Sequence, residues 1–184
     1  MISKLKDVAQ IKFCLLSKQD YDKDNKLIIP ANLLENNVIQ DYELDNRIKV
    51  DDSMRVYPKD IIIKRISPSY VNYIDEVDED VYAAGNLIIV RPTEIDSKYL
   101  AYILDKNISR ITSSLVGAAL PAISRGDLEN IQIPMLTIEK QQKVGEVWYK
   151  SIKTYKLRER LNELQKIRTK ALIDEFVLNN NGDR

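Results

Sequence analysis

The sequence predicts a mixed α/β, strand-rich globular domain followed by a long C-terminal α-helix that forms a coiled coil. Two β-branched runs, at 61–63 and 87–90, are bounded by turn-forming residues and predict buried strands. From 137 to 178 the chain contains no proline and one glycine, Gly145, which predicts a long helical region. We therefore place a globular domain at 1–137 and a helical region at 138–180.

Residue types that are scarce exclude several kinds of catalytic site. The chain contains no histidine and one cysteine, Cys14, so Ser-His-Asp and Cys-His catalytic systems and the usual zinc sites are excluded. Cys14 lies in an apolar run, which predicts a buried, inert thiol. No apolar run approaches the roughly 20 residues of a membrane span, and charges interrupt the N-terminal segment. We expect a cytoplasmic protein.

Charge is distributed unevenly along a chain whose formal net charge is zero. The 11 Lys/Arg and 7 Asp/Glu of 138–184 give this region a net charge of +4, which leaves −4 for 1–137. A strongly basic DNA-binding domain has a different balance.

The N-terminal half predicts short strands separated by polar turns. Residues 2–16 contain one or two strands, 17–26 form a polar loop, and 27–30 are extended. A helical turn follows within 31–38, and 54–57 are extended. The first of the two confident strands lies within 58–66.

The C-terminal half predicts a strand at 87–92 and a short helix at 97–104. Residues 124–127 predict a polar turn, and a short strand then ends at Pro134, because proline cannot donate to a strand ladder. Thr137 is the expected N-cap of the following helix.

Two apolar stripes follow each other along this helix, out of phase. Val144 and three further residues form the first stripe, namely Trp148, Ile152 and Tyr155. The second fits a heptad pattern, with Arg168 and Glu175 as polar interruptions that can pair across an interface, and consists of Leu157, Leu161, Leu164, Ala171 and Leu178. We expect a short helix packed on the domain, a bend within 149–156, and a coiled-coil helix. The alternative is a single helix packed on its own domain, but its length favours a partner helix.

The tetrapeptide 67–70, Ser-Pro-Ser-Tyr, is similar to the catalytic motif of N6-adenine methyltransferases but lacks its second proline. The chain has no glycine-rich loop for S-adenosylmethionine and no phosphate-binding loop. We therefore interpret 67–70 as a turn after a strand and predict no catalytic residue, no metal and no cofactor.

Polar and cationic residues gather at the ends of the predicted strands and around the turn at Gly117. Arg side chains can bond guanine bidentately, and Ser or Tyr hydroxyls can contact bases or phosphates. The candidate DNA-binding residues are Lys64, Arg65, Ser67, Ser69, Tyr70, Arg91, Ser113, Ser124 and Arg125.

The segment 115–142 carries a family resemblance. Gly117, Pro121 and Ile123 fit a Gly-x-x-x-Pro-x-Ile turn, and an Asp-Leu-x-x-Ile-x-Ile-Pro strand then ends at Pro134, ahead of a helix that carries Gln141. This order resembles the end of a target-recognition domain in the DNA specificity subunits of type I restriction–modification systems. We interpret Gly117, Pro121, Pro134 and Gln141 as residues that shape the chain.

The resemblance covers nearly the whole chain as a half-length form with a single recognition domain. It implies a non-catalytic subunit that directs an adenine methyltransferase, and in some systems a restriction subunit, to a bipartite DNA site. S-adenosylmethionine would bind the methyltransferase, and two copies of this chain would pair through the C-terminal helix. The alternatives are a coiled-coil adaptor or a DNA-mimicking inhibitor, which the acidic domain would suit.

Overall fold

The computed structural model describes residues 1–14, 25–34, 38–39, 43–45, 51–78, 80–114 and 122–180. The chain divides into two compact units, Met1–Tyr149 and Lys150–Arg184. The division falls inside the long C-terminal helix, so the first unit includes the beginning of this helix. The predicted domain boundary at 137/138 coincides with the start of the helix and otherwise stays a prediction.

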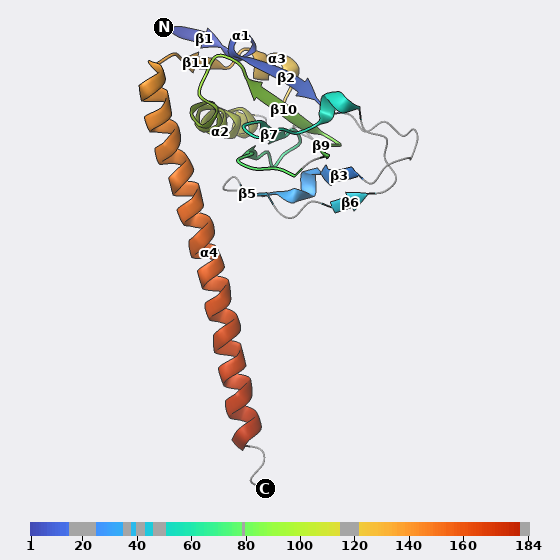
Figure 1. Cartoon of the computed structure of the whole chain (residues 1–184), viewed down its shortest axis with the longest axis vertical. Helices are drawn as coiled ribbons and strands as arrows, with labels where there is room; N and C mark the ends of the chain where they lie inside the picture. The colour runs from blue at the N-terminus through green and yellow to red at the C-terminus, as the bar shows by residue number, and fades with distance from the viewer. Residues whose placement is uncertain are drawn as a thin grey trace. The chain divides into compact units, whose positions relative to one another are not determined.

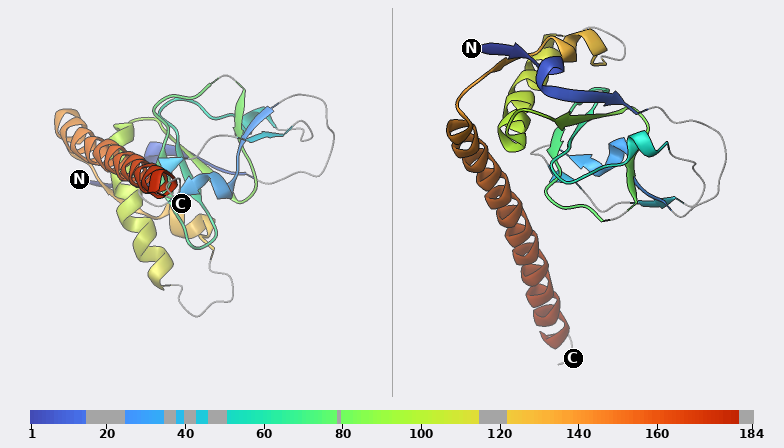
Figure 2. Two further views of the ribbon diagram at one scale, coloured as in Figure 1. Left: turned by 90° about the horizontal axis from the view of Figure 1, so that it is seen from below. Right: turned by 45° about the horizontal axis from the view of Figure 1, so that its top comes forward.

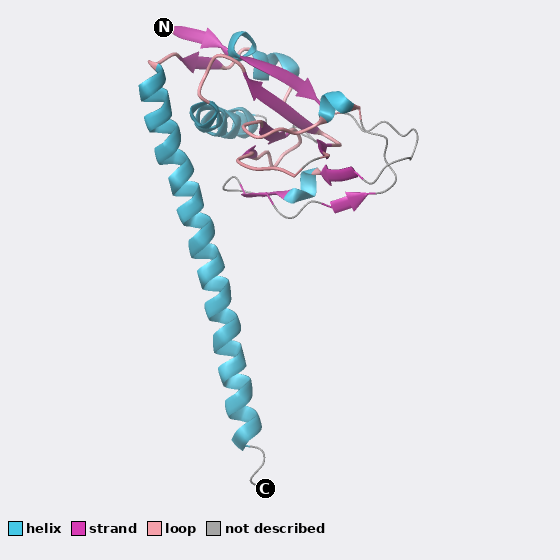
Figure 3. Ribbon diagram, viewed as in Figure 1, coloured by secondary structure: helices cyan, strands magenta, loops and turns pink. Residues whose placement is uncertain are grey.

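The structure confirms a mixed α/β chain with a long C-terminal helix (Figures 1 and 3). In chain order the elements of the described residues, with 3₁₀ helices labelled η, are β1 (Ile2–Lys4), α1 (Leu5–Val8), β2 (Ala9–Phe13), β3 (Asn25–Ile28), η1 (Pro30–Asn32), β4 (Leu33–Leu34), β5 (Val38–Ile39), β6 (Glu43–Asp45), η3 (Asp52–Met54), β7 (Ile61–Lys64), β8 (Val71–Tyr73), β9 (Val81–Ala83), β10 (Leu87–Pro92), α2 (Ser97–Ser114), α3 (Arg125–Glu129), β11 (Gln132–Pro134) and α4 (Ile138–Asn180).

The centre of the first unit is an antiparallel four-stranded sheet in the order β2-β10-β7-β8. Opposed residues of neighbouring strands lie on the same face, and Ile88 stands opposite both Ile63 and Phe13. This face packs against apolar residues of α2 such as Leu100 and Leu104, and together they form the first hydrophobic core.

The opposite face of the sheet is buried too. Ile62 and Ile89 lie on it and join a second core with Ile28 of β3 and Val81 of β9. Strands β3 and β9 belong to a separate three-stranded sheet in the order β6-β3-β9. Burial on both faces explains why β7 and β10 read as continuous apolar runs rather than as alternating patterns.

A two-stranded sheet connects the start of the chain to the segment that precedes α4. Strand β1 pairs with β11, so that Ser3 stands opposite Ile133. The amide of Leu5 also donates to the carbonyl of Ile131 at 3.0 Å, and α1 packs against α3 (Figure 2). Ile133 is fully buried in the first core.

The beginning of α4 is fixed to the domain by a buried glutamine and a glycine. Gln141 accepts a hydrogen bond from the amide of Asp96 at 2.9 Å and donates one to the carbonyl of Leu136 at 2.9 Å. Gly145 lies against the start of α2, where an added Cβ would be 2.7 Å from the amide nitrogen of Tyr99. Trp148 packs against the first core. We call this contact the α4 root.

Several predicted elements differ from those observed. A helical turn, α1, interrupts the strands predicted at 2–16, and α2 continues to Ser114 rather than ending at 104. The predicted turn at 124–127 is the start of α3, because Ser124 and Asp127 form a capping box. The sequence predicted two helices after 137, whereas α4 is one uninterrupted helix, since 149–156 contain no helix-breaking residue.

Burial raises the pKa of the Cys14 thiol to about 11, which agrees with the predicted inert cysteine. Among the described residues, no helix is both long and apolar enough to cross a membrane.

The close approach at Gly145 generates a stability prediction. Gly145→Ala places a Cβ within 2.7 Å of Asp96 Oδ1 and of the Tyr99 amide nitrogen, and we expect it to lower the free energy of unfolding by about 1–3 kcal/mol. Gly126→Ala in α3 is the matched control, because its Cβ would meet nothing closer than 4.0 Å. Urea denaturation measures both variants, and equal stabilities would contradict the proposed tight contact.

Candidate DNA-recognition surface

Backbone hydrogen bonds bring two segments that are distant in sequence to one end of the four-stranded sheet. The amide of Lys64 donates to the carbonyl of Tyr70 at 2.9 Å, which closes the turn between β7 and β8. The amide of Ile123 donates to the carbonyl of Arg65 at 3.0 Å. The residues that precede α3 therefore lie beside the end of β7, although nearly 60 positions separate them along the chain.

Cationic side chains stack on aromatic rings at this end of the sheet. The guanidinium carbons of Arg65 and Arg125 lie 5.7 and 4.7 Å from the centroid of the Phe13 ring. Lys64 Nζ lies 5.2 Å from the centroid of the Tyr70 ring. We call these five residues the strand-end surface. Cation–π contacts hold the charged groups in defined positions, which favours recognition of an anionic or planar ligand.

Arg65 and Arg125 differ in burial and in the partners of their guanidinium groups. Arg65 donates from Nε to the carbonyl of Ile123 at 3.2 Å and is half-buried. Arg125 is exposed, and its Nη1 lies 3.1 Å from Glu129 Oε1. An exposed i,i+4 ion pair contributes little to stability. Arg125 is therefore available to exchange this partner for a ligand.

The three predicted serines near this surface differ in exposure and in hydrogen bonding. Ser67 is exposed in the turn after β7. Ser69 is half-buried, and its Oγ finds no hydrogen-bond partner within the described part of the chain. Ser124 Oγ accepts from the amide of Asp127 at 3.1 Å and so caps α3. The capping role gives Ser124 a structural function in addition to any contact with DNA.

Arg91 does not join the strand-end surface. Strand β10 is antiparallel to β7, so the C-terminal end of β10 lies at the opposite end of the sheet from the C-terminal end of β7. There Arg91 Nε and Nη2 donate to both oxygens of Asp60, each at 2.8 Å, and Nη2 also donates to the carbonyl of Arg55. The hydrogen bonds to Asp60 raise the pKa of the Arg91 guanidinium. Grouping Arg91 with Lys64 ignored the alternation of strand ends in an antiparallel sheet.

Some predicted residues lie at the limit of the described structure. Ser113 belongs to the last turn of α2, where only the backbone is described. Gly117 and Pro121 lie outside the described residues. Pro134 ends β11, and its carbonyl accepts a hydrogen bond from the Tyr99 hydroxyl at 2.7 Å. Phe13 was missed, although an aromatic residue near the end of a predicted strand was a usable signal.

The predicted interface residues of α4 separate into two groups. Trp148 packs against the first core and Ile152 is buried, so both leave little surface for a partner. Tyr155 is exposed and donates to Glu159 at 2.9 Å. Exposed residues of the heptad pattern are Leu157, Leu161, Leu164 and Ala171, whereas the side chain of Leu178 lies outside the described structure. A further exposed apolar group lies outside the predicted heptad pattern near the C-terminal end of α4, namely Leu172, Ile173, Phe176 and Val177.

A cleft of about 910 Å³ lies beside Arg91 and the α4 root. Its charged lining residues include two ion pairs, Arg91 with Asp60 and Lys98 with Glu146. This pairing makes the cleft a poor candidate for a phosphate groove. Within the described ranges, no group of three or more Cys, Asp or Glu residues is arranged to hold a metal ion.

The described domain is strand-rich, holds cations on aromatic rings at one end of its central sheet, and continues into a long helix. Residues 1–167 match the family model of the type I restriction modification DNA specificity domain. The chain belongs to this family, whose members are non-catalytic DNA-recognition subunits. No curated protein matches the sequence.

Three solved structures share the fold. A chain from a study of complex assembly and conformational transition of the type I R-M system has a TM-score of 0.64 at 16% identity, over 94% of this chain and 43% of that one. The S subunit from M. genitalium has a TM-score of 0.54 at 14% identity, over 80% and 37% of the two chains. The HsdS subunit from Thermoanaerobacter tengcongensis has a TM-score of 0.56 at 17% identity, over 84% and 37%. This chain therefore spans less than half the length of each.

The buried ion pair at the far edge of the sheet generates the second prediction. Arg91→Met leaves the Asp60 carboxylate, which is 1% exposed, without its ion-pair partner. We expect a loss of about 2–3 kcal/mol in the free energy of unfolding, below the usual figure for a fully buried pair because Arg91 is partly solvated.

Arg125→Met is the control, since it removes an exposed ion pair and should change stability by at most about 0.5 kcal/mol. Thermal and urea denaturation compare the two variants. An equal effect of both substitutions would show that Asp60 does not depend on Arg91.

Proposed function

We propose that this chain is the half-length specificity subunit that directs a separate adenine methyltransferase to a bipartite DNA site. The family match over 1–167 carries this proposal, and the strand-end surface supplies the chemistry. Arg65 and Arg125 can donate bidentate hydrogen bonds to guanine, and Lys64 and Ser67 can contact the backbone or bases. The chain itself would need no cofactor, because S-adenosylmethionine would bind the methyltransferase.

The partners follow from the same proposal. The methyltransferase subunit would dock on α4 and the adjoining domain, and a restriction subunit would join where the system includes one. Because chromosomal DNA and S-adenosylmethionine meet in the cytoplasm, we propose a cytoplasmic location.

A second copy of this chain supplies the other half of the recognition site in this proposal. The chain spans 43%, 37% and 37% of the three solved relatives, so two copies approach the length of one of them. Leu157, Leu161 and Leu164 are 72%, 54% and 47% exposed, which is unusual for leucines unless another surface covers them. Pairing through these residues in an antiparallel coiled coil would give a twofold dimer and an interrupted palindromic target.

The acidic excess of 1–137 is the observation that favours a DNA-mimicking inhibitor. A mimic requires an array of unpaired carboxylates. Several carboxylates of the domain pair with cations instead, among them Asp60, Asp80 and Glu129. The cations stacked on Phe13 further support recognition over mimicry.

DNA recognition is tested by removing one cation from the strand-end surface. Arg125→Gln should weaken DNA binding by the reconstituted methyltransferase complex roughly tenfold, because one bidentate contact is lost. Lys170→Gln, which removes one positive charge from exposed α4, should leave affinity within about twofold. Fluorescence anisotropy on DNA that contains the mapped methylation motif measures both. Unchanged affinity for both variants would exclude Arg125 from the interface.

Pairing of two copies is tested by sedimentation of the free protein at tens of micromolar. The native chain should be a dimer, and Leu161→Asp with Leu164→Asp should make it monomeric, since each substitution places a charge in the apolar contact. Ile173→Asp is the control, because Ile173 is equally exposed but outside the heptad pattern. A monomeric native chain, or an asymmetric methylation motif from a complex with this specificity chain alone, would refute the dimer.

A further inference from the structure

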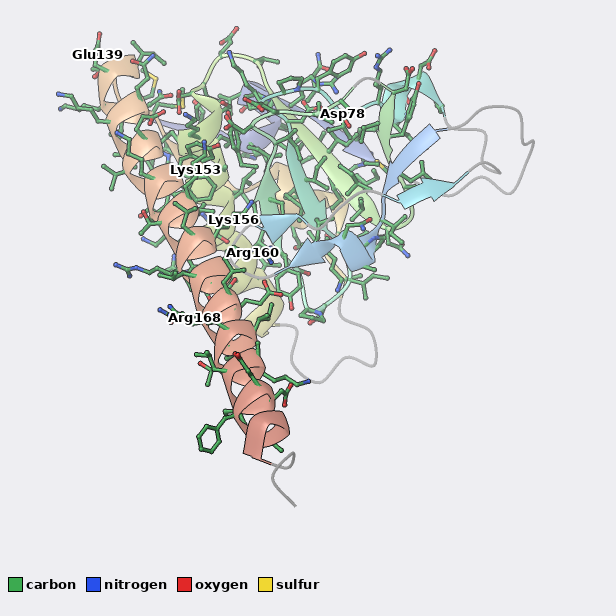
Figure 4. All side chains as sticks on the ribbon, turned by 60° about the horizontal axis from the view of Figure 1, so that its bottom comes forward. Asp78, Glu139, Lys153, Lys156, Arg160 and Arg168 are labelled. Atoms are coloured by element: carbon green, nitrogen blue, oxygen red, sulfur yellow. The ribbon has the colours of Figure 1, made fainter. Side chains whose placement is uncertain are left out.

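The two ends of α4 between Lys150 and Glu175 carry opposite charges, whereas charges of both signs mix between them, among them Glu159, Lys166 and Lys170. The first part of this stretch carries Lys150, Lys153 and Lys156, and its last part carries Asp174 and Glu175. All five side chains are exposed, and Figure 4 labels Lys153 and Lys156 on α4. Any partner that runs alongside this helix therefore meets positive charge at one end and negative charge at the other.

Both kinds of charge lie on or beside the face that carries the exposed leucines. The heptad pattern of Leu157, Leu161 and Leu164 continues in both directions at spacings of three and four. Its earlier positions are Lys150 and Thr154, and its later positions are Arg168, Ala171 and Glu175. Lys153 and Asp174 occupy the flanking position just before Thr154 and Glu175, respectively. We call the line of heptad positions from Lys150 to Glu175 the α4 seam.

A twofold antiparallel pair places residues opposite one another symmetrically about a central point. When Leu161 of one copy faces Leu164 of the other, Leu157 faces Arg168 and Thr154 faces Ala171. Lys150 then faces Glu175, and Lys153 lies beside Asp174 at the flank. Each relation occurs twice, so four pairs of opposite charge flank a central cluster of four leucines.

We propose that α4 pairs with a second copy of itself in this one antiparallel register, fixed by Lys150–Glu175 and Lys153–Asp174 ion pairs between copies. The proposal rests on the antiparallel dimer proposed above and adds its register. Arg168 then lies over Leu157, where its aliphatic stem covers the leucine and its guanidinium reaches solvent. Arg168 and Glu175 do not pair with each other, because both occupy the same heptad position and antiparallel pairs bring opposite positions together.

Other arrangements of the same helices place the charges unfavourably. A shift of one heptad in one direction puts Arg168 against Lys150, and a shift in the other puts Glu175 against Leu157. A parallel pair sets Lys150 against Lys150 and Glu175 against Glu175. The first shift and the parallel pair set like charges opposite one another, which disfavours pairing. The second shift separates Glu175 from Lys150 and so loses this ion pair. The seam therefore favours the proposed register over each of these arrangements.

The register also sets a distance. The symmetry point lies between residues 162 and 163, so the Tyr149 residues at which the two domain units end are roughly 40 Å apart along the helix axis. This span corresponds to about 12 base pairs of DNA.

Charge reversal in the full-length chain tests the register. Lys150→Glu and Glu175→Lys should each weaken the dimer by about tenfold or more, because each replaces two attractive pairs with two repulsive ones. The double variant should recover the native dissociation constant to within about threefold. Lys166→Glu, the same charge change outside the seam, is the control, and circular dichroism checks that α4 stays helical.

The outcomes separate the register from the dimer itself. The register would be overturned, and the dimer left intact, if both single variants dimerised with the dissociation constant of the native chain. The same conclusion would follow if the double variant dimerised no more tightly than the single variants. A native chain that is monomeric at tens of micromolar would overturn the dimer and the register together. Restoration in the double variant supports both.

Disulfide cross-linking gives an independent readout. A chain carrying Thr154→Cys and Ala171→Cys should form a covalent dimer under mild oxidation, because the register places these positions opposite each other. Cys14 does not compete, since it is buried and its pKa is raised to about 11. A chain carrying Leu161→Cys and Ala171→Cys tests the register shifted by one heptad, and preferential cross-linking of this chain would overturn the proposal.

Discussion

The hydrogen bonds of Gln141 fix where the long helix starts. Its side chain is 3% exposed and bonds simultaneously to the amide of Asp96 and the carbonyl of Leu136. A buried amide that lost one of these partners would destabilise the contact by about 1–3 kcal/mol. Gly145, one turn further on, lets the helix approach the start of α2. Both residues lie within two turns of Trp148, which packs against the first core.

Burial of the four-stranded sheet on both faces determines where recognition can take place. Ile61 and Ile63 face one core, and Ile62 faces the other, so none of these side chains can meet a ligand. Apart from edge-strand residues such as Gln10 and Lys12 of β2, the ends of the strands are the accessible parts of the sheet. The pairing of Ile66 with Ala122 brings the segment before α3 to one such end, next to Phe13. The proposed recognition surface therefore depends on a contact between distant segments that no local pattern contains.

The sequence was sufficient for elements whose signals are local. The runs 61–63 and 87–90 predicted β7 and β10, and Pro134 and Thr137 marked the end of β11 and the start of α4. The sequence was insufficient where contacts between distant segments determine which residues become neighbours. Arg91 looked like a neighbour of Lys64 until the antiparallel order of β7 and β10 separated them. Phe13 gained its role only from two arginines that arrive from elsewhere in the chain. The capping box at Ser124 was a local signal for a helix that was read as a turn.

The separation of core from strand-end surface has an evolutionary consequence. Ser67, Ser124 and Arg125 are exposed, whereas the isoleucines that hold the sheet together are fully buried. Substitutions at exposed positions away from caps usually change stability by no more than about 0.5 kcal/mol. Residues such as Ser67 and Arg125 can therefore vary between descendants of this chain while the scaffold persists, so that new binding preferences can arise through viable intermediates.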